Sequence, residues 1–394
     1  MIKFFKSKWS YIVYFIIIII IILYEAQGKG DFNIFLSASR DLMLKKNIYK
    51  TLYNDWYHYY YDVSFALFLF PFTFFPLYLV KIFWLLLNVF FVFRIWVNIK
   101  NLVQISLLKK KNQNIFIILS FIFIFSFIRD NFHLSQLTIF ILFSILEGLN
   151  LIDKNNKIAG SFLISLGISI KLLPIVIIPY LIYRNQLKPV IYIILFILLL
   201  LFIPALFIGY DYNNYLLIER WSLINPINQK HILDTSERSF HSLTTLLSTL
   251  LVEDCGDLHA LPLKRNIANL SIEKLNLIIN IIRGVLVLST LYFLNTKPFK
   301  SVRNNIQKLY EIGYICLLIP LIFPHQQFYA FFLIFSIFFS ICSFRSASVL
   351  SSSVFLSTSS VTSVISIKNL TYKSGVGSSS FSDSSSEINS AKII

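Results

Sequence analysis

Long apolar runs separated by shorter polar stretches recur along most of the chain. The first run, Trp9–Tyr24, follows Lys3, Lys6 and Lys8, and no small-residue cleavage site comes after it, so it predicts a retained signal anchor. A helix that spans a bilayer needs about 20 mainly apolar residues. Further runs of this kind lie at 77–98, 115–128, 136–152, 158–183, 189–208, 275–294, 309–323 and 328–344. Each run predicts one membrane helix, with a single exception.

The exception is the run 158–183, which is interrupted at its centre by Lys171 and Pro174. A lysine inside an apolar span is costly, and proline breaks a helix because it lacks the amide hydrogen. We therefore expect a hairpin of two short helices that turns at this point. The pattern as a whole predicts an all-α polytopic membrane protein with about ten transmembrane helices.

Two of the polar stretches, 25–76 and 210–274, are long enough to form large outer loops. In the first loop, apolar residues at 32, 35, 36 and 42 predict an amphipathic helix that lies on the bilayer. Residues 63–76 are apolar but short and interrupted by proline, which predicts an interfacial or re-entrant piece. The Ser-rich stretch from 346 onward predicts a disordered cytoplasmic tail, so we divide the chain into a membrane domain, 1–345, and a tail, 346–394.

Composition excludes the soluble classes. Of 394 residues, 56% are hydrophobic and only 14% are charged, which is too apolar for a soluble core to bury. We interpret the net charge of +16 as membrane topology, because the excess of Lys and Arg falls on one side of the predicted spans. This bias predicts a multi-pass protein of the inner (plasma) membrane with a cytoplasmic N-terminus. Nucleic acid is not an expected partner.

Known cofactor and nucleophile motifs are missing from the sequence. It has no P-loop, dinucleotide glycine fingerprint, zinc-binding motif or nucleophile elbow, and its three cysteines form no framework. No cofactor is therefore expected and no residue is named as a metal ligand, which leaves the metal requirement open.

Two charged residues stand out beside apolar runs. Asp31 follows the first membrane helix in Gly28-Lys29-Gly30-Asp31, where the glycines allow a tight turn that would hold the carboxylate close to the membrane surface. A carboxylate there can take a proton from an acceptor hydroxyl. Lys171, at the tip of the predicted hairpin, could bind a lipid phosphate as a point charge or could extend to the lipid headgroups.

Other candidates lie in the predicted outer loops. The aromatic cluster Trp56–Tyr61 predicts either an interfacial aromatic belt or a surface on which sugars stack. The adjacent Arg129 and Asp130 form either a local solvated pair or part of a site. The remaining candidates are Gln136, which follows that loop, Arg220, Arg238 and His241 in the second long loop, and His325 in a late outer turn.

The order of these features resembles glycosyltransferase family 87, a polyprenol-phosphate-dependent group with the GT-C membrane architecture. The similar segments are Gly30-Asp31-Phe32 through Ser39, Asn47-Ile48-Tyr49, Phe65–Pro71, Leu134-Ser135-Gln136, Ala159-Gly160 through Lys171 to Pro174, Ser239–Leu243 and Phe323-Pro324-His325. The sequence departs from the family pattern where Ser135 replaces glycine, Phe240 replaces asparagine and Tyr61-Asp62 replaces a Tyr-Pro pair.

The resemblance implies an inverting transferase that moves mannose or another hexose from a polyprenyl-phosphate sugar to a lipid or glycan acceptor on the extracytoplasmic side. Asp31 matches the general base, and Lys171 and His325 match positions near the donor phosphate. We expect Arg220 and Arg238 to assist them. Acceptor or sugar contacts are expected from Asp130, Gln136, His241 and Tyr61.

Two other classes of function stay open at this stage. A transporter or a flippase for lipid-linked glycans would need polar residues inside the spans, and Glu147 and Arg283 are such residues. A non-catalytic assembly or polymer-ligation protein would need no cavity at Asp31.

Overall fold

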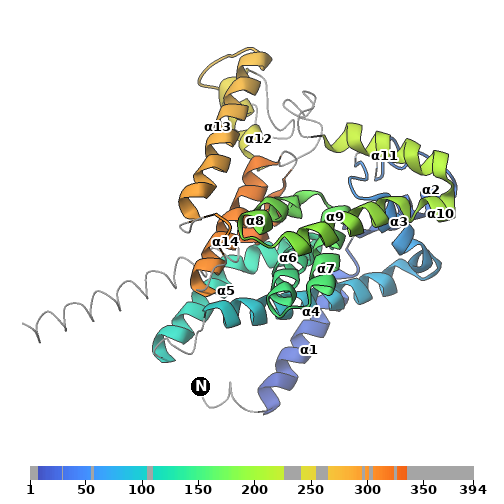
Figure 1. The fold of residues 1–394 in the computed structure, drawn as a ribbon. Coiled ribbons are helices and arrows are strands. Elements are labelled where there is room, and N and C mark those ends of the chain that lie inside the picture. Colours follow the sequence, from blue (N-terminus) through green and yellow to red (C-terminus); the bar gives the residue numbers. More distant parts are fainter. Residues whose placement is uncertain are drawn as a thin grey trace, which may run out of the picture. The chain divides into compact units, whose positions relative to one another are not determined.

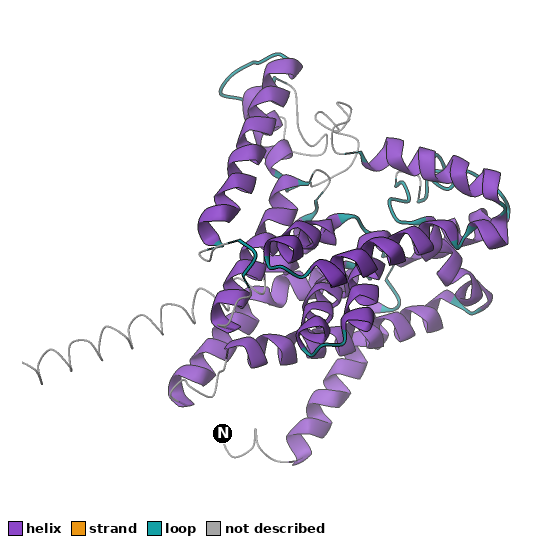
Figure 2. Ribbon diagram, in the orientation of Figure 1, coloured by secondary structure: helices purple, strands orange, loops and turns teal. Residues whose placement is uncertain are grey.

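The computed structural model describes residues 8–28, 30–54, 57–103, 110–225, 241–253, 265–294, 298–300, 305–323 and 326–334. Within these ranges the elements are helices, and an isolated antiparallel bridge joins Tyr53 and Tyr57 (Figures 1 and 2). Residues 1–343 form one compact unit. The predicted Ser-rich tail lies outside the described residues.

The helices follow one another in this order: α1 Lys8–Glu25, α2 Phe32–Met43, α3 Val63–Leu69, η2 Phe70–Phe74, α4 Leu77–Val103, α5 Lys110–His133, α6 Thr138–Asp153, α7 Lys157–Ile170, η4 Leu173–Val176, α8 Ile177–Tyr183, α9 Leu187–Phe202, α10 Ala205–Ile208, α11 Tyr210–Ile224, α12 Leu243–Leu251, α13 Ile272–Phe293, α14 Asn305–Ile322 and η6 Phe328–Ile334. The prefix η marks a 3₁₀-helix.

The described residues contain fewer full membrane spans than the apolar runs suggest. Three helical segments, Leu77–Leu102, Leu187–Ile208 and Ile272–Tyr292, are long and apolar enough to cross a bilayer. A fourth span results if α5 and α6, which are bent by 118° at their junction, count as one. About ten spans are therefore not confirmed. Several apolar runs instead form helices of 10–17 residues, which are short for a bilayer of ordinary thickness.

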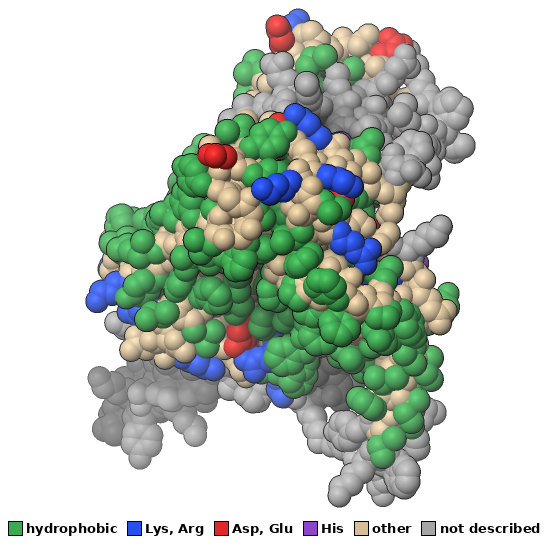
Figure 3. Space-filling view, turned by 90° about the vertical axis from the view of Figure 1, so that its right-hand side faces the viewer, with side chains coloured by type: hydrophobic (Ala, Val, Ile, Leu, Met, Phe, Trp, Pro, Cys, Tyr) green, Lys and Arg blue, Asp and Glu red, His purple; other side chains and the backbone are tan. Residues whose placement is uncertain are grey.

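Apolar side chains also cover much of the surface, as a membrane protein requires. Figure 3 shows a face on which hydrophobic side chains predominate. On α9, Leu198 and Leu199 are about half exposed, and on α13, Val285 and Leu288 are more exposed still. Such contiguous apolar surface is stable against lipid but not against water. The all-helical fold and the membrane class predicted from the sequence are confirmed.

The amphipathic helix predicted in the first outer loop is α2. Phe32, Phe35, Leu36 and Leu42, the residues of the predicted apolar face, are all buried. They pack against α3 and η2, which are the short helices of the predicted interfacial piece. Asp62 begins α3 by accepting a hydrogen bond from the backbone N–H of Ser64 over 2.8 Å.

Helices α6 and α7 form the tightest pair in the centre of the bundle (Figure 1). They meet through glycines, because a Cβ atom placed on Gly160 would lie 2.5 Å from the carbonyl oxygen of Gly148. Backbones approach this closely only where both residues lack side chains. The short turn 154–156 joins the two helices, so the start of α6 and the end of α7 lie at the same end of the pair.

The predicted hairpin is present in the described chain. Helix α7 ends at Ile170, and after Lys171 the chain continues in η4 and α8. The end of α8 returns to the far end of α6, because Arg184 lines the same small cavity as Ile152 and Asp153. Lys171 and Arg184 therefore lie at opposite ends of the hairpin.

Two buried carboxylates inside the bundle are paired. Glu147 on α6 accepts hydrogen bonds from Arg94 over 2.5 Å and from Asn98 over 2.7 Å, both on α4. Glu311 on α14 forms an ion pair with Arg184 over 2.5 Å. Burying a charge without a partner costs several kcal/mol, so removal of either partner would destabilise the bundle.

Candidate functional site

Asp31 is held by a close contact between two loops. Its backbone N–H donates to the carbonyl oxygen of Leu134 over 2.8 Å. A Cβ atom on Gly30 would lie 3.0 Å from the carbonyl oxygens of His133 and Leu134, which is tighter than most Cβ contacts, so glycine lets the two loops meet without displacement. The turn that follows α5 thus fixes the position of Asp31 at the start of α2.

Gln136 holds the side chain of Asp31. Its Nε2 donates a hydrogen bond to Oδ2 of Asp31, and its Oε1 accepts one from the Tyr61 hydroxyl over 3.3 Å. Gln136 is itself buried, and its backbone N–H donates to the carbonyl oxygen of Asn131 over 2.9 Å. Ser135, which stands where the family pattern has glycine, has a φ of 54°, a left-handed conformation that glycine adopts most easily.

Lys171 faces the same place from the break between α7 and η4. Its Nζ lies 5.7 Å from the centre of the Tyr329 ring, and its charge interacts with that of Asp31. Both helices of the α6–α7 pair thus contribute to one site from the same end of the pair: Gln136 precedes α6 and Lys171 follows α7.

The surroundings of Asp31 change its acidity. Burial raises the pKa of its carboxyl from 3.8 to about 6, because removing a carboxylate from water disfavours the charged form. The hydrogen bond from Gln136 and the positive charge of Lys171 both lower this pKa and so oppose part of the effect. A carboxylate with a pKa of about 6 is still ionised at neutral pH and is a stronger base than an ordinary aspartate.

Asp31 and Lys171 line a cavity of about 960 Å³, measured out to its open mouth. Its lining is part apolar and part aromatic and polar. The apolar residues come from α2, the helix break, the end of α11 and the residue after α14, and the aromatic and polar residues come from the first outer loop and from residues 326–329. The apolar lining comprises Ile34, Phe35, Leu172, Leu173, Leu223, Ile224 and Phe323, and the polar and aromatic lining includes Tyr57, His58, Tyr60, Tyr61, Gln326, Gln327 and Tyr329.

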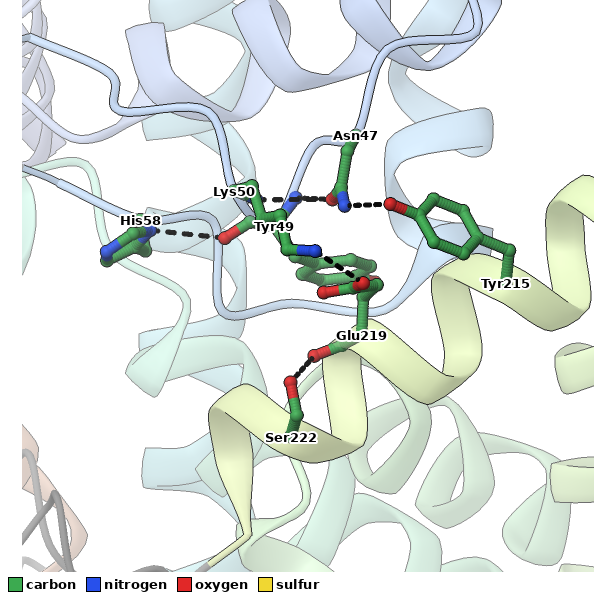
Figure 4. A network of polar contacts seen from close by, with 7 residues as sticks. All are labelled: Asn47, Tyr49, Lys50, His58, Tyr215, Glu219 and Ser222. Atoms are coloured by element: carbon green, nitrogen blue, oxygen red, sulfur yellow. Dashed lines mark hydrogen bonds and ion pairs between the residues drawn. The ribbon is translucent and has the colours of Figure 1, made fainter.

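A polar network ties the first outer loop to α11, whose end forms part of the cavity wall (Figure 4). Asn47 Nδ2 donates to the Tyr215 hydroxyl over 2.7 Å, and Lys50 forms an ion pair with Glu219 over 2.7 Å. These bonds join segments that are 168 and 169 residues apart in sequence. They fix the loop that carries His58 and the tyrosines.

The other predicted site residues fall in three groups. His241 lies beside the cavity lining, because its backbone N–H donates to the carbonyl oxygen of Gln326 over 2.7 Å. Asp130 is paired with Arg129 over 3.3 Å and does not line the cavity. His325 and Arg238 lie outside the described residues.

Arg220, expected at the donor phosphate, has a different environment. It is only 7% exposed, its guanidinium pairs with the carboxylate of Asp62, and it donates to the carbonyl oxygen of Ser169 over 2.8 Å. It does not line the cavity. In this position Arg220 links α11 to α3 and to the end of α7.

Glu147 and Arg283, the two polar residues that could mark a transport path, are engaged within the bundle. Glu147 is paired as described above, and Arg283 donates to the Thr244 hydroxyl over 2.7 Å. Neither lines the cavity at Asp31.

Sequence reasoning missed several lining residues. Tyr57, His58 and Tyr60 belong to the aromatic cluster, whose two interpretations could not be separated without the fold. Gln326, Gln327 and Tyr329 follow the late Pro-His turn. The sequence feature that could have identified these three residues is a short polar stretch between two apolar runs.

The family model of glycosyltransferase family 87 matches residues 59–254. This range includes Tyr61, Gln136 and Lys171, whereas Asp31 precedes it and His325 follows it. The searches of curated proteins and of solved structures returned no match. On the family match, the chain belongs to glycosyltransferase family 87 and is a membrane glycosyltransferase.

Proposed function

We propose that the protein transfers a hexose, with mannose as the first candidate, from a polyprenyl-phosphate donor to a lipid or glycan acceptor, and that Asp31 is the general base. The observation that carries this proposal is that Asp31 and Lys171, a carboxylate and an ammonium group, line one cavity. Transfer of a sugar from a phosphate needs a base at the attacking hydroxyl and a positive charge at the departing phosphate.

The reaction follows from this arrangement in one displacement. The acceptor hydroxyl forms a new bond to the anomeric carbon from the face opposite the phosphate, and its proton passes to the Asp31 carboxylate. The bond between the anomeric carbon and the phosphate oxygen breaks, and polyprenyl phosphate leaves with the electron pair. Lys171 balances the negative charge that grows on that phosphate. A single displacement inverts the anomeric configuration.

The mixed apolar and polar lining supports a lipid-linked donor. Leucine and isoleucine side chains from the helix break and from α11 supply an apolar wall beside Lys171. A polyprenyl phosphate has the matching character, since an apolar chain ends in a charged group. The family, which uses such donors by the resemblance given above, agrees with this choice.

Charge distribution supports an extracytoplasmic site. The turn after α6 and the neighbouring starts of α7, α9 and α14 carry Lys154, Lys157, Lys188 and Lys308, at the end of the α6–α7 pair away from Asp31. Since cytoplasmic loops are enriched in Lys and Arg, that end belongs on the cytoplasmic side and Asp31 on the opposite side.

The experiment compares sugar transfer by wild type and Asp31→Asn in isolated membranes. Radiolabelled polyprenyl-phosphate mannose and glucose are supplied, and the labelled products are extracted. Loss of general base catalysis is expected to reduce transfer by about 100-fold or more. Asp41→Asn is the matched control, because Asp41 lies on the same helix but pairs with Lys46 over 3.0 Å outside the cavity lining.

Full transfer by Asp31→Asn would remove Asp31 as the base. Transfer by neither wild type nor the control, with both inserted in the membrane, would contradict the choice of donor.

A further inference from the structure

His58 lines the same cavity as Asp31, and the reaction proposed above gives it no role. It is half-buried and belongs to the aromatic part of the cavity lining. Its Nδ1 lies 3.1 Å from the carbonyl oxygen of Tyr49. Among the described residues, the Tyr49 carbonyl is the hydrogen-bond partner of the His58 ring.

The contact with Tyr49 decides which ring nitrogen carries the proton. A carbonyl oxygen can only accept a hydrogen bond, so Nδ1 of His58 must donate. In the neutral imidazole the other nitrogen, Nε2, then has a lone pair and acts as an acceptor. His58 therefore presents a hydrogen-bond acceptor on the side of the ring opposite Tyr49.

The Tyr49 carbonyl is itself held in place from several directions. The Asn47 side-chain oxygen accepts from the backbone N–H of Tyr49 over 3.0 Å, and the Tyr49 hydroxyl donates to the carbonyl oxygen of Tyr61 over 2.9 Å. The ties from Asn47 to Tyr215 and from Lys50 to Glu219 anchor the same segment to α11 (Figure 4). The orientation of the His58 ring is thus fixed before any ligand binds.

Aromatic rings surround this acceptor. The rings of His58 and Tyr60 meet edge to face with their centres 6.2 Å apart, and Tyr57 and Tyr61 line the same cavity. A sugar has apolar C–H faces and hydroxyl edges, so it matches a site in which aromatic rings lie beside a few oriented polar groups.

We propose that Nε2 of His58 accepts a hydrogen bond from a hydroxyl of a sugar bound against Tyr60, and that His58 is thereby a specificity-determining residue. The inference rests on the proposed function, because it assumes that the cavity binds sugar. The hydroxyl belongs either to the transferred sugar of the donor or to a sugar of the acceptor, and the experiment separates the two.

Two substitutions test the roles of the two ring nitrogens separately. His58→Asn keeps an amide donor near the position of Nδ1, so it preserves the bond to Tyr49 while removing the acceptor at Nε2. His58→Gln places an amide near the position of Nε2 and restores a polar partner there. His133→Asn is the matched control, since that histidine pairs with Glu25 over 2.9 Å and does not line the cavity.

Kinetics are measured with purified protein in nanodiscs. One arm varies radiolabelled polyprenyl-phosphate mannose, and the other varies the glycolipid fraction extracted from the host membranes. For His58→Asn we expect the KM of one of the two substrates to rise about tenfold, which is the loss of about one hydrogen bond. We expect kcat to stay within twofold, and His58→Gln to recover most of the loss.

An unchanged KM for both substrates overturns the proposal, as does a fall in kcat alone, which would indicate a role in proton transfer. Binding of octyl α-mannoside, followed by intrinsic fluorescence, provides a readout without turnover. Equal binding by wild type and His58→Asn also overturns the proposal. A wild type that binds this glycoside about tenfold more tightly than His58→Asn, yet transfers no sugar, supports the contact and contradicts the proposed function instead.

Discussion

At the scale of single residues, the site depends on how the protein controls the ionisation of Asp31. Burial raises the pKa of the carboxyl to about 6, while Gln136 and Lys171 limit the rise. The result is a compromise, because a higher pKa makes a better base and a lower pKa keeps the base ionised at working pH. Under the proposed function, Gln136 therefore acts on the reaction through Asp31, as a positioning residue.

This balance predicts the pH dependence of transfer. Below a pH of about 6 the Asp31 carboxyl is protonated and cannot accept the proton of the acceptor, so kcat/KM should fall tenfold per pH unit. Replacement of Gln136 by Met removes a hydrogen bond that lowers the pKa, so the acid limb should move to higher pH. The measurement is kcat/KM between pH 5 and 9 in nanodiscs.

A control variant should leave this profile in place. Asp41→Asn changes a carboxylate on the same helix outside the cavity lining, so its acid limb should coincide with that of wild type. A wild-type profile that is flat down to pH 4.5 would contradict the role of Asp31 as base.

The sequence identified Asp31 and Lys171 because a charge next to an apolar run needs an explanation. The same reasoning could not distinguish Asp31 and Lys171 from Arg220 and Asp130, whose roles depend on the residues with which they pair. Arg220 pairs with Asp62, 158 residues earlier in the chain, and such a pairing depends on the tertiary fold. His58 was indistinguishable from an interfacial aromatic residue, because its tautomer is set by the Tyr49 carbonyl, which no local pattern reveals.

At the scale of helices, the pair α6 and α7 sets the geometry of the site. Gln136 and Lys171 lie at the same end of this pair. The distance between Gln136, which holds Asp31, and the positive charge of Lys171 therefore depends on how the two helices pack. The close contact of Gly148 and Gly160 fixes that packing, since neither backbone has room for a side chain.

We predict that Gly160→Ala both destabilises the protein and reduces transfer. The new methyl group would lie 2.5 Å from the Gly148 carbonyl oxygen and 2.8 Å from Ile152 Cγ1, so α7 must move and carry Lys171 with it. We expect a loss of about 1–3 kcal/mol in stability, as for other overpacked cores. Thermal unfolding in detergent and the transfer assay measure the two effects.

Gly284→Ala is the matched control. Gly284 lies on α13, and a Cβ atom there would have no heavy atom within 4 Å, so the change should be neutral or slightly stabilising through helix propensity. Equal melting temperatures for Gly160→Ala and Gly284→Ala would contradict the importance of the α6–α7 contact.

Helix positions were predictable where the backbone itself decides them. The break at Lys171 and the buried face of α2 followed from proline chemistry and from helical periodicity. The number of spans did not follow, because an apolar run indicates only that its side chains leave water. Short helices such as α3 and α7 satisfy the same pattern by packing against protein, and hydropathy does not distinguish protein from lipid.

At the scale of the whole molecule, the two ends of the α6–α7 pair differ in charge and in composition. Asp31, Lys171 and the aromatic wall lie at one end, and lysines gather at the other. Helix α6 has 16 residues, so its ends are about 24 Å apart. That length is below the roughly 30 Å of a bilayer's apolar core, so the difference in charge between the two ends, and not the length of α6, supports the proposal that they face opposite sides.

This polarity predicts which residues can be labelled in intact cells. Leu44 and Lys154 are both exposed residues that follow directly after a helix. Leu44 ends the helix that Asp31 begins, and Lys154 lies at the end of the α6–α7 pair away from Asp31. In a background in which Cys255, Cys316 and Cys342 are replaced by alanine, a membrane-impermeant maleimide should label Leu44→Cys in intact cells. Lys154→Cys should be labelled only after permeabilisation.

Labelling of both cysteines to the same extent in intact cells, or the reverse pattern, would contradict an extracytoplasmic site. The cysteine-free background, treated in parallel, reports labelling of other proteins.

The turn between α6 and α7 offers a practical advantage. Residues 153–156 are exposed, and Asn155 has a φ of 65°, which is typical of a tight surface turn. Foreign sequence is best tolerated at such tips. An affinity tag or fluorescent domain inserted after Asn155 would therefore lie at the end of the α6–α7 pair away from Asp31, and it would allow purification or detection of the protein without disturbing the packing of the two helices.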